Sequence, residues 1–85
     1  PYWKIAGEPD GAVPEVGVVY DVQHSRKGRF TLRATSINGE WLTGIIVKGV
    51  ARAAMFYNVA EKGEELTIRD AHSYLVRVGR KGNDR

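Results

Sequence analysis

The dipeptide Asn38-Gly39 constrains the fold of this chain more than any other feature, because of the segments on either side of it. Residues 29–37 (RFTLRATSI) alternate apolar and polar side chains, and residues 40–48 (EWLTGIIVK) form a second β-prone segment. An Asn-Gly pair between two such segments is the strongest short signal for a β-hairpin, since a type I′ turn requires positive φ at both central positions. We therefore expect an antiparallel hairpin that turns at Asn38 and Gly39.

A two-residue turn also fixes the register of the hairpin, and here it sets Ser36 opposite Trp41 and Arg29 opposite Lys48. One face then carries the side chains expected in the core, which are Phe30, Leu32, Trp41, Ile45 and Val47. The other face carries cations and threonines with two apolar residues among them, namely Arg29, Thr31, Arg33, Thr35, Lys48, Leu42 and Ile46. Two cations directly opposite each other destabilise a sheet unless an acid lies nearby. This face therefore favours binding of an anionic partner.

Three further segments carry strand signals: VGVVYDVQH (16–24), ELTIR (65–69) and YLVRV (74–78). Between the last two, DAHS fits a single 3₁₀ turn with Asp70 as a capping acceptor. These signals predict one all-β domain over residues 15–79. An extended, Pro/Gly-rich arm (1–14) precedes it, and a flexible tail (80–85) follows it.

Residues 50–63 (VARAAMFYNVAEKG) are ambiguous. Their alanines and the closing Gly63 allow a helix with a glycine cap. Met55, Phe56, Tyr57 and Val59 favour a strand, and we prefer that interpretation.

Five or six short antiparallel strands, with one 3₁₀ turn before the last of them, have the plan of a small SH3-like β-barrel. Residues 30–78 also resemble Sm-like domains, through INGEWLTGIIV (37–47) and ELTIRDAHSYLVRV (65–78). The resemblance implies a strongly bent barrel in which Gly44 lets a strand bend sharply. Where Sm-like proteins hold RNA bases after the second strand, this chain has VKGVARAA (47–54). The resemblance therefore implies a fold and no binding site.

The composition narrows the class of function. The chain has no cysteine, which excludes disulfides and thiolate metal sites and suits a cytoplasmic protein. No apolar run approaches the roughly 18–20 residues of a membrane span, so we expect no membrane association.

The pairs His24-Ser25 and His72-Ser73 are sequence neighbours, whereas a hydrolase needs groups that converge in space. We expect a non-enzymatic protein without a cofactor or a metal, because the histidines and carboxylates have no ligand spacing.

The segment HSRKGRF (24–30) is the strongest candidate for a binding loop. The net charge is only +3, but residues 26–52 contain six of the basic side chains and a single acid, Glu40. A glycine-containing turn with several cations can present guanidinium groups and backbone N–H groups to phosphates. We therefore expect nucleic-acid binding, as in accessory proteins of prokaryotes, phages and plasmids. The candidate residues are His24, Arg26, Lys27, Arg29, Arg33, Lys48 and Arg52.

Two alternatives remain open at this point. One is a protein-interaction module or an inhibitor of a host protein, with an apolar patch that comprises Leu42, Ile46, Phe56 and Tyr57. The other is a homo-oligomeric structural or assembly protein that pairs through an edge strand.

Overall fold

The computed structural model describes residues 2–52 and 59–80, and within these ranges the protein is all-β. The strands in chain order are β1 (Lys4–Ile5), β2 (Val18–His24), β3 (Gly28–Asn38), β4 (Trp41–Gly49), β5 (Ala51–Arg52), β6 (Val59–Ala60), β7 (Glu65–Arg69) and β8 (Ser73–Arg80). One 3₁₀ turn, η1 (Asp70–His72), lies between β7 and β8. No helix in the described ranges is long and apolar enough to cross a membrane.

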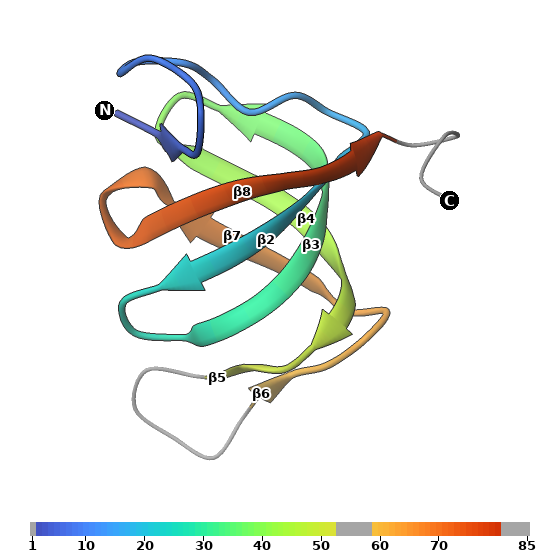
Figure 1. Ribbon diagram of the computed structural model, residues 1–85. Helices are drawn as coiled ribbons and strands as arrows, with labels where there is room; N and C mark the ends of the chain where they lie inside the picture. Colours follow the sequence, from blue (N-terminus) through green and yellow to red (C-terminus); the bar gives the residue numbers. More distant parts are fainter. Residues whose placement is uncertain (1, 53–58, 81–85) are drawn as a thin grey trace.

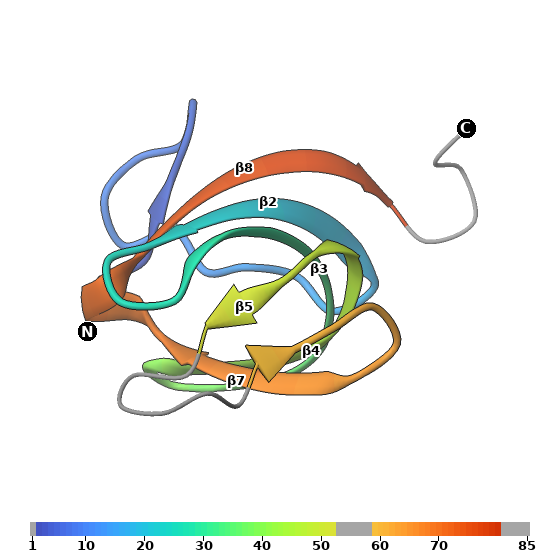
Figure 2. The same cartoon turned by 90° about the horizontal axis from the view of Figure 1, so that it is seen from below.

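Six of the strands form one strongly curved sheet in the order β1-β8-β2-β3-β4-β7, and β5 pairs with β6 separately (Figure 1). Seen from below, β8 and β7 lie on opposite sides of the core (Figure 2). The sheet ends in two different strands, so it is open, whereas a closed barrel was expected. The expectation of purely antiparallel pairing is also wrong, because β1 runs parallel to β8.

The turn between β3 and β4 lies one residue later than the sequence predicts. Asn38 pairs with Trp41, so Gly39 and Glu40 occupy the central positions of the turn. Gly39 has a φ of 62°, and no non-glycine residue in the described ranges has a positive φ. A type I′ turn at Asn38-Gly39 would need a positive φ at Asn38, whereas a type II′ turn needs one only at its first central residue. Glycine at that position satisfies the type II′ requirement.

A β-bulge reverses the faces of β4, because the pairing of β3 with β4 shifts by one residue between Ala34 and Ser36 and successive side chains of a strand point to opposite sides of the sheet. The later turn by itself moves the pairing by two residues and keeps the same faces. Leu42 and Ile46, expected on the exposed face, are fully buried, and Trp41, expected in the core, is 45% exposed. The predicted pairing of Arg29 with Lys48 is wrong as well, since Thr31 faces Lys48. The core contains Trp3, Ile5, Val18, Tyr20, Val22, Phe30, Leu32, Ala34, Leu42, Ile46, Ala51, Ile68 and Leu75.

Gly44 explains why the tertiary structure prefers this register. A Cβ atom at Gly44 would lie 2.7 Å from Leu32 Cγ and still closer to the carbonyl oxygen of Arg33. Such contacts are too short for any side chain, so β3 and β4 can approach this closely only at a glycine. The resemblance implied that Gly44 lets the strand bend sharply. The structure shows that Gly44 permits a close approach of the β3 and β4 backbones.

Both ends of the ambiguous segment are strands. Ala51 pairs with Ala60 and Arg52 with Val59, while residues 53–58, including Phe56 and Tyr57, lie outside the described ranges.

The predicted 3₁₀ turn is confirmed, but the predicted cap is wrong. Asp70 is buried, and no side chain caps the turn. Instead, Ser73 Oγ donates a hydrogen bond of 2.7 Å to the carbonyl oxygen of Arg69.

The N-terminal residues complete the core. Trp3 and Ile5 are buried, and Trp3 Nε1 donates a hydrogen bond of 3.0 Å to the carbonyl oxygen of Gly39. Residues 6–17 then cross the upper end of the sheet in Figure 1. Arg77 holds this crossing in place through ion pairs with Glu15 (3.2 Å) and Glu8 (3.8 Å).

Candidate functional site

The 3₁₀ turn η1 brings three parts of the sheet to one corner of the molecule. β7 ends at Arg69, opposite Trp41, and β8 begins at Ser73, opposite His24. The backbone N–H of Ser25 donates a 2.9 Å hydrogen bond to the carbonyl oxygen of His72. The basic loop between β2 and β3 therefore lies against η1.

The loop comprises three residues, Ser25, Arg26 and Lys27, because His24 pairs with Gly28 across the hairpin. Gly28 has a φ of 88°, which three-residue hairpin loops require after their turn and which glycine adopts without strain. His24 Nδ1 accepts hydrogen bonds of 3.1 Å from the backbone N–H groups of both Arg26 and Lys27. The buried histidine thus sets the shape of the loop that carries the two cations.

The histidine performs this role in its neutral form. Burial, together with the charges of Lys27, His72 and Arg26, lowers the pKa of His24 to about 4. Because Nδ1 accepts two hydrogen bonds, the proton of the neutral ring lies on Nε2. Protonation of Nδ1 would remove both acceptor contacts, so the loop keeps this shape only while His24 is uncharged.

A second pair of contacts joins the loop to η1. Ser25 Oγ and His72 Nδ1 lie 3.1 Å apart, and the rings of His24 and His72 have centroids 5.4 Å apart. Asp70 precedes His72 by two residues, but its Oδ2 is buried without a hydrogen-bond partner, so this oxygen does not orient the histidine. The arrangement anchors the loop. No group of three or more metal-ligating side chains occurs among the residues described.

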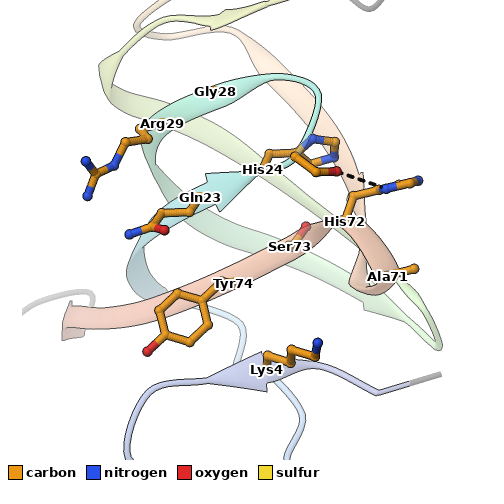
Figure 3. Close-up of a pocket in the computed structure, with 10 residues that line it drawn as sticks. Lys4, Gln23, His24, Gly28, Arg29, Ala71, His72, Ser73 and Tyr74 are labelled. Atoms are coloured by element: carbon orange, nitrogen blue, oxygen red, sulfur yellow. Dashed lines mark hydrogen bonds between the residues drawn. The ribbon is translucent and has the colours of Figure 1, made fainter.

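Two hollows open on either side of these histidines. The first has a volume of about 430 Å³ and extends from the loop to β1. Figure 3 shows Gln23 between Arg29 and Tyr74, which matches its pairing with both residues across the sheet. Lys4, on β1, pairs with Tyr74 from the other side. The hollow therefore combines two cations, an amide and an aromatic ring that is 40% exposed.

The second hollow, of about 270 Å³, lies on the other side of the loop and shares His24 and His72 with the first. Its walls carry Arg26, Lys27 and Arg69 around the exposed ring of Trp41. The Arg69 guanidinium lies over that ring, 5.7 Å from its centroid, and also pairs with Glu40 at 3.2 Å.

No carboxylate lines either of these two hollows. We call the surface that they form the basic corner and define it by Lys4, Arg26, Lys27, Arg29, Arg69 and His72. Two other hollows differ in this respect. One, of about 290 Å³, has Asp21 beside Lys48, and another, of about 260 Å³, has Glu64 and Glu65 beside Arg52. Lys27 also borders the hollow with the two glutamates and Arg29 the hollow with Asp21, so the corner adjoins acidic groups on these two sides.

The predicted site residues divide into three groups. Arg26, Lys27 and Arg29 meet at the basic corner, and buried His24 supports them. Arg33 and Lys48 lie along the outer face of the sheet. On that face Asp21 accepts a 2.8 Å hydrogen bond from Thr31, the neighbour of Lys48 across the hairpin.

The remaining predicted residues lie elsewhere. Arg52 donates its backbone N–H to the carbonyl oxygen of Lys27 (2.9 Å), but its hollow contains two glutamates. Leu42 and Ile46 are buried, so the apolar patch built on them is wrong. The other members of that patch, Phe56 and Tyr57, are outside the described ranges.

Sequence reasoning missed five members of the site, namely Lys4, Trp41, Arg69, His72 and Tyr74. Trp41 was assigned to the core by the wrong register, and Gly44 was the signal that could have corrected it. Lys4 and Arg69 come from distant parts of the chain, and no local pattern joins them to residues 24–29. Comparison of the chain with protein-family models, with curated proteins and with solved structures gave no match.

Proposed function

We propose that this protein binds nucleic acid through the basic corner. The observation that carries the proposal is the pair of adjoining hollows, whose lining includes five cationic side chains and two histidines but no carboxylate. One of these cations, Arg69, is paired with Glu40 beside the second hollow. Nucleic-acid surfaces of proteins combine such cations with small polar donors, because most of their hydrogen bonds go to phosphate and sugar oxygens. Ser25, Gln23 and Thr67 supply such polar groups here.

The cations suit phosphate contacts in different ways. Arginine offers a planar fork of N–H donors that matches two phosphate oxygens, whereas lysine supplies a compact charge on a flexible stem. The corner has three of the first kind and two of the second. Lys4 and Arg29 line the first hollow, and Arg26, Lys27 and Arg69 line the second. Binding through about three to five phosphates would give affinity a steep dependence on salt.

The experiment is a fluorescence-anisotropy titration of labelled, mixed-sequence DNA and RNA at about 50 mM salt, repeated at about 200 mM. We expect binding that weakens by at least about tenfold between the two salt concentrations. The double variant Arg26→Ala/Lys27→Ala should weaken binding by about tenfold or more at low salt, because it removes two phosphate contacts.

The matched control is Lys48→Ala/Lys62→Ala, which removes the same charge outside the corner. We expect this control to change affinity by less than about threefold, since only general attraction is reduced. Equal losses in the two double variants would contradict the assignment to the basic corner. Absence of binding to any nucleic acid at low salt would contradict the function itself.

We also propose that the chain is related in fold to SH3-like and Sm-like barrels. The 3₁₀ turn before the last strand, the curved sheet and the glycine at the close approach of β3 and β4 support it. Backbone hydrogen bonds between β1 and β7, sought by NMR, would support a closed barrel in solution, and their absence would contradict it.

A second candidate function is self-association, in which two copies of this chain pair through the edge of β8. β1 pairs only with Tyr74 and Leu75, so among the described strands none pairs with the rest of that edge. Val76 and Val78 are exposed there. Unpaired edges of this kind are templates for pairing with another chain. Sedimentation equilibrium would support this candidate with a dimeric or larger mass and contradict it with a monomeric mass.

A further inference from the structure

The two hollows of the basic corner share a feature that phosphate binding does not need. Each exposes an aromatic ring: Tyr74 in the first, 40% exposed, and Trp41 in the second, 45% exposed. Other aromatic side chains of the sheet, Tyr20 and Phe30, are buried in the core. Both exposed rings lie beside cations at the same corner, and His72 borders both hollows.

The Trp41 ring is held rather than loose. Arg69 lies over it, and Glu40 holds the Arg69 guanidinium by a 3.2 Å hydrogen bond. Trp41 also pairs with Arg69 across β4 and β7, so the backbone supports the same contact. A ring fixed in this way keeps its orientation without losing side-chain entropy when a flat ligand stacks on it.

The Tyr74 ring is placed between groups that recognise two parts of a nucleotide. Gln23, its cross-strand neighbour, carries an amide that can donate to and accept from the edge of a base. Lys4, on its other side, and Arg29, beyond Gln23, supply positive charge for the adjoining phosphates. Figure 3 shows these four side chains around the same hollow.

Stacking on protein rings requires bases whose faces are free. In a duplex both faces of an internal base are covered by its neighbours, whereas a single strand can splay its bases onto aromatic side chains. We propose that the basic corner selects single-stranded nucleic acid, with unpaired bases stacked on Tyr74 and Trp41 and the connecting phosphates at Arg26, Lys27 and Arg29. This inference rests on the proposed function and narrows its ligand to one class.

The first test compares a labelled single strand of about 12 thymidines with a blunt duplex of equal length, by anisotropy at low salt. We expect the single strand to bind at least about tenfold more tightly. Tyr74→Leu and Trp41→Leu should each weaken its binding by about 5- to 100-fold, as loss of one stacked base does. Tyr74→Phe is the matched control, because it keeps the ring and should stay within about threefold of the native affinity.

The second test uses the fluorescence of Trp41 itself. The chain has two tryptophans, and Trp3 is buried, so quenching by a stacked base is expected at Trp41 alone. Titration of the native protein with unlabelled single strand should quench the emission, and the quenching should disappear in Trp41→Phe. The Trp3→Phe variant, checked for folding by circular dichroism, should keep it.

The outcomes separate this inference from the function on which it rests. Equal affinity for single strand and duplex, with no effect of Tyr74→Leu or Trp41→Leu, would overturn the inference and leave phosphate binding by the corner intact. Absence of binding by either form at low salt would overturn both. Preference for the single strand that survives both leucine variants would overturn the assignment of the two rings.

Discussion

His24 shows how one side chain can determine the shape of a candidate site without lying on its surface. It is buried, and its Nδ1 accepts hydrogen bonds from the two backbone N–H groups of the residues that carry the loop cations. Sequence reasoning placed His24 among the residues that contact nucleic acid. The structure gives it a supporting position, from which it affects Arg26 and Lys27 through their backbone.

The lowered pKa of His24 makes stability depend on pH. The pKa is about 4 in the folded protein and 6.5 for an unperturbed histidine, so between these values the unfolded chain binds the proton more readily. The stabilisation is therefore complete above about pH 6.5 and is lost as the pH falls toward 4. At about 1.4 kcal/mol per pKa unit, the loss is at most about 3.5 kcal/mol. Urea denaturation at several pH values measures it.

The control for this prediction is His24→Asn. The amide oxygen of asparagine can accept in place of Nδ1 but does not titrate, so the slope of unfolding free energy between pH 4 and 6.5 should become shallower. An unchanged slope would assign the pH dependence to carboxylates instead of His24.

At the scale of elements, the hairpin of β3 and β4 decides both the core and the site. The register shift at the β-bulge between Ala34 and Ser36 buries Leu42 and Ile46 and turns Trp41 outward, where it lines the second hollow. Without the bulge, Trp41 would lie on the core side of the sheet and the corner would have no exposed tryptophan. The bulge therefore sets both the core packing and the chemistry of the surface, because the two faces of a strand change together.

The register has a direct consequence for mutational stability. Leu42→Ala should lower the unfolding free energy by about 2–5 kcal/mol, because it leaves a cavity at a fully buried position. Trp41→Ala, one residue away, should cost much less, since the ring is half exposed and its main contact is Arg69. Chemical denaturation of both variants measures the difference. The reverse order of the two effects would show that Trp41 and not Leu42 faces the core, as in the predicted hairpin without the bulge.

At the scale of the whole molecule, the N-terminal residues belong to the fold. Trp3 and Ile5 are part of the core cluster, and β1 adds Lys4 to the basic corner. In a chain of this size each large buried side chain contributes a substantial share of the total stability. The arm therefore connects the stability of the sheet with the composition of the candidate site.

Replacement of Trp3 tests this connection. Trp3→Ala should lower the unfolding free energy by about 3–5 kcal/mol, because it removes a buried indole and its hydrogen bond to Gly39. Tyr2→Ala, at the exposed neighbouring position, should change it by less than about 0.5 kcal/mol. Thermal denaturation followed by circular dichroism compares the two. Equal stability of Trp3→Ala and the native chain would mean that the sheet folds without the arm.

The sequence by itself determined the class of the fold, the five longer strands, the 3₁₀ turn and the buried face of β3. These depend on local patterns: alternation with a period of two, β-branched residues, and turn residues at strand ends. Phe30, Leu32 and Ala34 are buried as their alternation predicts. The cationic loop was also evident, since its residues are consecutive.

Only the tertiary structure decided the register of β4, the pairing of β1 with β8 and the composition of the basic corner. The alternation along β3 does not reveal that its pairing with β4 shifts by one residue between Ala34 and Ser36, because this shift depends on packing between strands. Burial of Leu42 and Ile46, and the close approach that only Gly44 permits, favour the shifted pairing. The corner joins Lys4, residues 24–29 and Arg69 through strand pairing, a non-local interaction that a single sequence does not reveal.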